Sequence, residues 1–216
     1  TGALNVAVGQ NALQANTTAS YNTAFGSCTL YANTTGAENT AVGYQSLRQN
    51  TCGNMNTANG YAALQANTTG SHNTAFGRTA LYNTSSGNYN TAVGAQTMCT
   101  NSTGSSNIAV GFKALFSNTT GHRNSASGMY SLKSNTEGAY NTASGYESLR
   151  SNTTGCSNAA LGYESMDANT TGCRNVAVGM EALKANTTGS FNTASGYKAL
   201  CKNTTAGFNS AFGYMS

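Results

Sequence analysis

A strict repeat of seventeen residues runs through the whole chain without an insertion or deletion. Twelve full units begin at Asn5, and a partial thirteenth begins at Asn209. We number the positions of each unit from 1, the opening Asn, to 17; the consensus is Asn-Thr-Ala-x-Gly-x-x-Ala-Leu-x-x-Asn-Thr-Thr-Gly-x-x, where x varies. A unit this short cannot bury its own apolar side chains and must stack on copies of itself. The repeat therefore predicts a rod-like solenoid with one unit per coil.

The composition of the unit favours β structure over helix. Gly and Asn recur every few residues and would interrupt a helix before it reached a stable length. Positions 1 to 5 are typical of a short strand, because position 2 is usually β-branched. Positions 7 to 11 predict a second strand, and Asn-Thr-Thr-Gly at positions 12 to 15 predicts a turn. We therefore expect an all-β fold: a parallel β-solenoid (β-roll) of about 13 coils with 17 residues per coil.

The invariant positions indicate which side of the coil is the interior. Positions 3 and 5 are Ala and Gly in every unit, and position 9 is Leu except at Met98 and Met166. Strand alternation then places positions 1, 3 and 5 inside, with the Asn side chains of successive coils hydrogen-bonded in a ladder, and position 4 outside. One Leu and one or two Ala per coil make a thin core. We therefore expect self-association, as a trimer or a filament bundle, through the semi-apolar position 4.

Composition and charge exclude several function classes. Charged residues make up 7% of the chain, and the ten Lys and Arg are scattered instead of aligned, so nucleic-acid binding is not supported. No apolar run is long enough for membrane insertion of this segment. The uniform repeat predicts a single repeat domain over residues 1–216. Because Thr1 and Ser216 both lie inside a unit, we expect the domain to be a segment of a longer fibre.

The repeat resembles known families of surface proteins. Its Asn-x-Ala-x-Gly strand resembles the head-domain repeats of trimeric autotransporter adhesins, and the longer unit, as in residues 141–155, is similar to repeat arrays in phage tail-fibre-like proteins. The resemblance covers the whole chain. It implies a left-handed β-roll, usually trimeric, that serves as a spacer or adhesive head on a cell or virion surface. Cell-surface glycans or a receptor are the partners that it implies.

Asn-x-Ser/Thr acceptor motifs recur at position 12 of the coil. In a secreted chain they predict a row of N-linked sugars along one edge, whereas the alternative is turn chemistry in which the hydroxyls cap backbone groups. The candidate acceptors are Asn16, Asn33, Asn67, Asn101, Asn118, Asn152, Asn169, Asn186 and Asn203, together with Asn83 at position 11.

Two of the six Cys occupy the same repeat position in consecutive units. Cys156 and Cys173 both fall at position 16, so their Cα atoms should lie about 5 Å apart, within the range of a disulfide. A disulfide and two stacked free thiols are both open at this point. The other four Cys have no in-register neighbour, and no spacing suggests zinc.

Charged and aromatic residues also recur in register. Glu147, Glu164 and Glu181 share position 7, which we interpret as a solvent-facing row rather than a catalytic or calcium site, because it has no pocket. Position 6 holds Tyr44, Tyr61, Tyr146, Tyr163 and Tyr197, which should stack along the coils, with carbohydrate binding as the alternative. His72 and His122 lie in distant units. We therefore predict no catalytic, cofactor or metal site, and no enzyme.

Two hypotheses for function remain. The first is a structural or adhesive extracellular fibre, in which the repeat sets length and the varied positions set adhesion. The second is a ligand-binding β-solenoid such as an ice-binding protein, suggested by Thr at positions 2, 13 and 14. The adjacent Thr pair of each turn should point to opposite sides of the coil, which favours the fibre.

Overall fold

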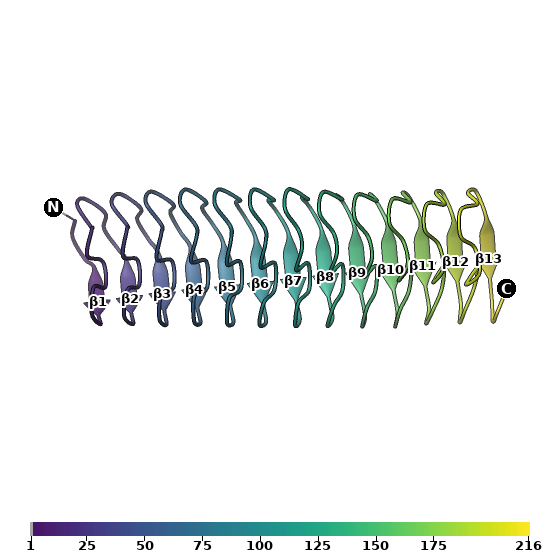
Figure 1. The fold of residues 1–216 in the computed structure, drawn as a ribbon, viewed down its shortest axis with the longest axis horizontal. Helices are drawn as coiled ribbons and strands as arrows, with labels where there is room; N and C mark the ends of the chain where they lie inside the picture. The colour runs from purple at the N-terminus through teal and green to yellow at the C-terminus, as the bar shows by residue number, and fades with distance from the viewer. Residues whose placement is uncertain (1) are drawn as a thin grey trace. The chain divides into compact units, whose positions relative to one another are not determined.

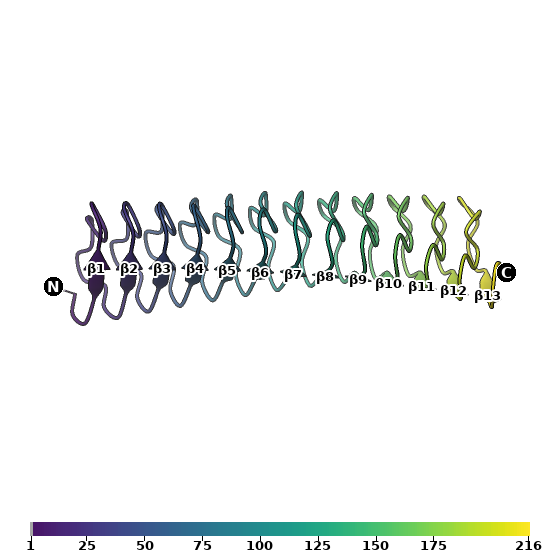
Figure 2. The ribbon, with the colours of Figure 1, turned by 90° about the horizontal axis from the view of Figure 1, so that it is seen from below.

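A computed structural model describes residues 2–216, so Thr1 lies outside the description. The described residues contain one three-residue strand per coil and no helix (Figures 1 and 2). Successive strands begin seventeen residues apart, which confirms the predicted all-β, parallel β-solenoid. The strands are β1 (Val6–Val8), β2 (Thr23–Phe25), β3 (Thr40–Val42), β4 (Thr57–Asn59), β5 (Thr74–Phe76), β6 (Thr91–Val93), β7 (Ile108–Val110), β8 (Ser125–Ser127), β9 (Thr142–Ser144), β10 (Ala159–Leu161), β11 (Val176–Val178), β12 (Thr193–Ser195) and β13 (Ser210–Phe212).

The chain divides into two compact units, of which the first ends at Asn107 and the second begins at Ile108. The first unit contains β1–β6 and the second contains β7–β13. Within each unit, neighbouring strands pair in parallel with no shift in register, as in Ala24 opposite Ala41 and Ala160 opposite Ala177. The seventeen-residue spacing of the sequence therefore becomes the register of the sheet in both units.

The interior of each coil is built from the positions that the repeat keeps constant. Ala41 at position 3 and Leu47 at position 9 are fully buried in the first unit, and so are Ala160 and Leu149 in the second. Position 4 points outwards, with Phe25 56% exposed. The predicted inner and outer positions are confirmed.

The predicted second strand is wrong. Positions 6 to 11 form a turn in which positions 7 and 9 adopt the left-handed backbone region, as at Gln45 (φ 57°) and Leu47 (φ 50°). The coils still bond to each other there: the Leu47 amide donates to the Ala63 carbonyl at 3.0 Å. A left-handed Leu costs about 1–2 kcal/mol, and burying its side chain contributes about 1.5–3 kcal/mol. Burial therefore overrides the backbone preference.

Glycine is required at position 5 for two reasons. Gly43 has a φ of 115°, a region that other residues rarely adopt, and a Cβ on it would lie 2.7 Å from the carbonyl oxygen of Gly60 in the next coil. Any side chain at this position would separate neighbouring coils.

Two ladders of Asn side chains run through the interior. At position 1, the Asn39 backbone amide and Nδ2 donate to Asn22 Oδ1 at 2.9 and 3.2 Å, which confirms the predicted ladder. A second ladder at position 12 was not predicted: Asn50 Nδ2 donates to Asn33 Oδ1 at 2.7 Å and to the Gly53 carbonyl at 2.9 Å. The second ladder has a defect at Thr84, which replaces Asn. Thr84 Oγ1 and Asn67 Oδ1 are both buried without a hydrogen-bond partner.

Candidate interaction surface

The outward side of the strands forms a face without charge. Position 3 is buried, so strand alternation directs positions 2 and 4 outwards; we call these positions the strand face. No Asp, Glu, Lys or Arg occurs at either position in any strand. The position 4 side chains are Val8, Phe25, Val42, Asn59, Phe76, Val93, Val110, Ser127, Ser144, Leu161, Val178, Ser195 and Phe212.

The strand face is more regular in the first unit than in the second. Position 2 is Thr in the five successive strands β2–β6, which pair in register. In the second unit the same position holds Ile108, Ser125, Thr142, Ala159, Val176, Thr193 and Ser210. Only the first unit therefore presents an uninterrupted row of one hydroxylated side chain.

Aromatic columns accompany the strand face. At position 6, Tyr44 and Tyr61 stack with ring centroids 5.6 Å apart, and Tyr146 and Tyr163 stack at 5.3 Å with an interplanar angle of 11°. The predicted stacking is confirmed. Each ring in these pairs covers one face of its neighbour, so a sugar has only the remaining faces and the ring edges to contact.

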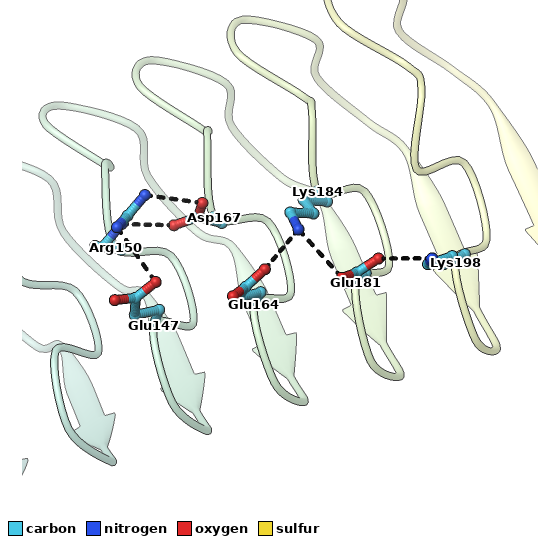
Figure 3. A network of polar contacts seen from close by, with 7 residues as sticks. All are labelled: Glu147, Arg150, Glu164, Asp167, Glu181, Lys184 and Lys198. Atoms are coloured by element: carbon cyan, nitrogen blue, oxygen red, sulfur yellow. Dashed lines mark hydrogen bonds and ion pairs between the residues drawn. The ribbon is translucent and has the colours of Figure 1, made fainter.

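The second unit carries a network of ion pairs at positions 7 and 10. We call Glu147, Arg150, Glu164, Asp167, Glu181, Lys184 and Lys198 the ion-pair network (Figure 3). Arg150 joins two coils: its Nη1 lies 3.2 Å from Glu147 Oε2, and its Nε lies 2.8 Å from Asp167 Oδ1. Its Nη2 also donates to Asp167 Oδ2 at 3.1 Å.

Lys184 joins the next two carboxylates in the same way. Its Nζ lies 2.5 Å from Glu164 Oε2 and 3.1 Å from Glu181 Oε1, and Lys198 Nζ lies 3.3 Å from Glu181 Oε2. The glutamate side chains are 14–17% exposed. The expectation of a carboxylate row facing solvent is therefore wrong: long cationic side chains from position 10 and from the next coil cover and pair with it.

The electrostatics of the ion-pair network do not suit acid–base chemistry. The hydrogen bond from Lys184 lowers the pKa of both Glu164 and Glu181. Burial raises the pKa of Asp167, and the Arg150 guanidinium partly offsets this by lowering it. Among residues 2–216, no three His, Cys, Asp or Glu side chains gather closely enough to hold a metal ion. The network is an arrangement that links coils.

The matching columns of the first unit are nearly neutral. Gln65 Nε2 donates to Gln45 Oε1 at 2.9 Å, and the Arg48 guanidinium lies over the Tyr31 ring at 5.6 Å from its centroid. The same backbone therefore supports an amide contact at these positions in the first unit and ion pairs in the second, and cation–π contacts occur in both, as between Lys133 and the Tyr130 ring.

Most acceptors of the predicted row of glycosylated asparagines are buried in the folded coil. Most acceptor nitrogens belong to the position 12 ladder; Asn152 Nδ2, for example, donates to Asn135 Oδ1 at 2.8 Å and to the Gly155 carbonyl at 3.0 Å. A sugar would replace one of the two hydrogens on such a nitrogen, so at least one of these hydrogen bonds would be lost in a closed interior, which opposes the modification in the folded coil. The fully buried candidates are Asn33, Asn67, Asn101, Asn118, Asn152, Asn169 and Asn186.

Asn83 differs from the other acceptor asparagines. It stands one position before the ladder, beside the defect at Thr84, and its side chain is exposed. Asn16 and Asn203 are half-buried, and their Nδ2 atoms donate to backbone carbonyls of Ala19 and Ala206. The folded chain therefore retains Asn83 as the one exposed acceptor among the ten candidates.

The structure brings the two position 16 cysteines together, and it places each histidine against an aromatic ring. Cys156 Sγ lies 2.8 Å from Cys173 Sγ, and both residues are half-buried. His72 stacks on Tyr89 with centroids 4.8 Å apart, and His122 meets the edge of Tyr140. The close approach of the two thiols is confirmed, and each histidine contacts an aromatic ring.

A recess of about 380 Å³ lies beside the last coil. Its lining includes Leu200 and Asn209, which hold positions 9 and 1, and also Cys201 and Met215. Positions 9 and 1 form the interior in the preceding coils. The recess therefore exposes core-type residues and brings no acid–base pair together.

Sequence reasoning missed two interior positions. Besides the position 12 ladder, position 8 is buried, with Ser46 and Ser148 donating to the carbonyls of Ala58 and Ala160 at 3.1 Å. The sequence does indicate that position 8 is buried, because the position holds a small side chain, Ala, Ser or Thr, in every repeat.

These features define the chain as a parallel β-solenoid with a varied outer surface. No protein-family model matches the sequence, and no curated protein or solved structure shows significant similarity to it.

Proposed function

We propose that this chain is a structural or adhesive segment of an extracellular fibre on a cell or virion surface. The coils set its length, and the strand face and aromatic columns make its contacts. The observation that carries the proposal is the division of each coil into a constant interior filled by Leu, Ala and Asn and an outer face without charge. No catalytic role enters the proposal.

The strand face supports self-association as part of this function. Phe25, Phe76 and Val93 are 56, 41 and 39% exposed in the first unit. Side chains of this kind lose little by desolvation and gain by packing on a second sheet. Other copies of the chain, as a trimer or a bundle, are the partners that this surface suits best. Contacts with a receptor or a glycan would use the exposed ring edges of the aromatic columns.

Light scattering and negative-stain imaging test the proposal together. We expect the chain to form elongated oligomers, and Phe25→Lys with Phe76→Lys to shift the mass to monomer. Thr35→Lys, at an exposed position outside the strand face, is the matched control and should leave the mass unchanged. A compact monomer at all concentrations would contradict the proposal.

A second candidate, a lattice-binding surface such as that of an ice-binding protein, rests on the threonine row of β2–β6. The rows at position 13 do not add to it, because Thr34 Oγ1 donates to the Thr51 carbonyl at 3.0 Å and is not free for a lattice. Position 4 beside the row alternates between Phe, Val and Asn, which makes the face uneven. A thermal-hysteresis assay tests this candidate. Clear activity in the parent chain, abolished by Thr57→Leu and Thr74→Leu, would favour ice binding over the fibre function.

A further inference from the structure

Position 16 has a defined structural role along the coils. Its side chain accepts a hydrogen bond from the position 16 backbone amide of the preceding coil. Ser71 Oγ accepts from Asn54 at 3.0 Å, and Asn88 Oδ1 accepts from Ser71 at 2.8 Å. Ser190 Oγ accepts from Cys173 at 3.0 Å. The position therefore favours an oxygen acceptor on a short side chain.

Cys156 and Cys173 replace that oxygen in two successive coils. Cys173 Sγ accepts from the Cys156 amide at 3.0 Å, so the column continues through sulfur. Sulfur is a weaker acceptor than a hydroxyl or amide oxygen. The backbone role alone therefore does not explain two consecutive cysteines.

The geometry places the two sulfur atoms within reach of each other. Cys156 Sγ donates to Cys173 Sγ across 2.8 Å, from coils that run parallel in register. Parallel neighbours lie about 4.8 Å apart, and disulfides accept Cα separations of about 4.4–6.8 Å. Both residues are half-buried, which leaves them accessible to small reagents.

We propose that Cys156 and Cys173 form a reversible disulfide that joins two adjacent coils. The oxidant is a low-molecular-weight disulfide such as oxidised glutathione. One cysteine thiolate attacks a glutathione sulfur, which breaks the glutathione S–S bond, forms a mixed disulfide and releases one glutathione thiolate. The second cysteine thiolate then attacks the protein sulfur of the mixed disulfide and releases the other glutathione. Two electrons and two protons pass from the protein thiols to the glutathione pair.

The bond would close a loop of one full repeat. Its stability effect arises because it restricts the unfolded chain, and it holds in the folded state two coils that already pair. The remaining cysteines occupy other columns: Cys28 at position 7, Cys52 at position 14, and Cys99 and Cys201 at position 10 of two repeats that are not adjacent. The bond is therefore specific to one pair of coils in the second unit and does not depend on the fibre function.

Mass spectrometry after graded oxidation tests the proposal on the full chain. The protein is incubated with oxidised glutathione, trapped with N-ethylmaleimide and digested with trypsin, which leaves both cysteines in the peptide between Arg150 and Arg174. We expect that peptide to lose two hydrogen masses and to take up no maleimide. Cleavage after Glu164 should then give two fragments that only a reductant separates.

Two variants complete the experiment. Cys156→Ser should leave Cys173 open to maleimide or carrying glutathione, whereas Cys52→Ser should behave as the parent chain. Oxidation should also raise the urea midpoint of the parent and of Cys52→Ser, but not of Cys156→Ser. Alkylation of Cys156 and Cys173 at the rate of the exposed Cys52 after oxidation, or a persistent glutathione adduct on the parent, would overturn the proposal.

Discussion

The two compact units share one interior and differ outside. In both, apart from the first coil and the last two, Ala at position 3, Leu or Met at position 9 and Asn at position 1 are closed from solvent. Yet the first unit holds only two of the ten basic residues and one of the six acidic residues, and the second holds the rest. The difference shows that the inner positions specify the coil, while the outer columns are free to take on separate tasks in different parts of the chain.

The largest expected change in the free energy of unfolding comes from truncating a buried Leu, and it tests whether the interiors of the two compact units are equivalent. Leu64→Ala in the first unit and Leu149→Ala in the second each remove a fully buried side chain, so each should lower the free energy of unfolding by about 2–5 kcal/mol. Urea unfolding measures the loss. Thr69→Ala and Thr154→Ala, at the exposed position 14, are the controls. A large effect in one unit only would break the equivalence.

The defect at Thr84 in the position 12 ladder leads to the next largest expected change in the free energy of unfolding. Repairing the defect in the first unit should stabilise the protein, whereas copying it into the second unit should destabilise it. Thr84→Asn should supply the donor that Asn67 Oδ1 lacks and stabilise the first unit by about 1–2 kcal/mol. Asn152→Thr should copy the defect in the second unit and cost about 1–3 kcal/mol, because it strands Asn135 Oδ1. Denaturant unfolding checks both. Destabilisation by Thr84→Asn would show that the site has adapted to Thr.

Acid should affect the second unit more than the first. The pKa values of Glu164 and Glu181 are lowered below their ordinary value of 4.5, so their stabilising contribution is present above that value and is lost as the pH falls through the lower folded values. Asp167, whose pKa burial raises, acts in the opposite direction and offsets part of the loss. Glu38 is the one carboxylate side chain of the first unit, against five in the second.

Hydrogen exchange at neutral pH and at about pH 3 measures this difference coil by coil. We expect amide protection near Leu183 to fall more than protection near Leu64. Lys184→Met should remove most of that pH dependence with only a small loss of stability at neutral pH, because the ion pairs are partly exposed. Equal acid sensitivity in the two units would count against the network.

The smallest effect on stability concerns the acceptor asparagines. In a host that N-glycosylates secreted chains, the folded product should carry a sugar at Asn83 and none at Asn118, with an unchanged unfolding midpoint. Peptide mass after glycosidase treatment reads the sites, and Asn83→Gln is the control. A sugar at Asn118 in folded protein would show that the second ladder opens.

The sequence was sufficient to predict the solenoid, its period and the inner role of positions 1, 3 and 9, because those positions hardly vary between units. It did not predict that Asn50 and its equivalents turn inwards, since Asn-Thr-Thr-Gly is equally typical of an exposed turn. It also did not predict the left-handed Leu47, because local preference opposes that conformation and only stacking on the next coil compensates for it. The ion-pair network depends on long side chains that reach across coils, a property that the spacing of the glutamates alone does not contain.

The unbroken register within each unit has a consequence for how such a chain changes in length. Nearly every bond between coils joins positions seventeen residues apart or one step from it, as in Leu47 to Ala63 and Asn50 to Asn33. Removing or duplicating a whole repeat leaves each remaining residue with an equivalent neighbour, whereas losing a single residue leaves one coil too short to keep its side chains in register with the coils on either side. Recombination between repeats in the gene is therefore compatible with the fold when it adds or removes whole repeats of seventeen residues.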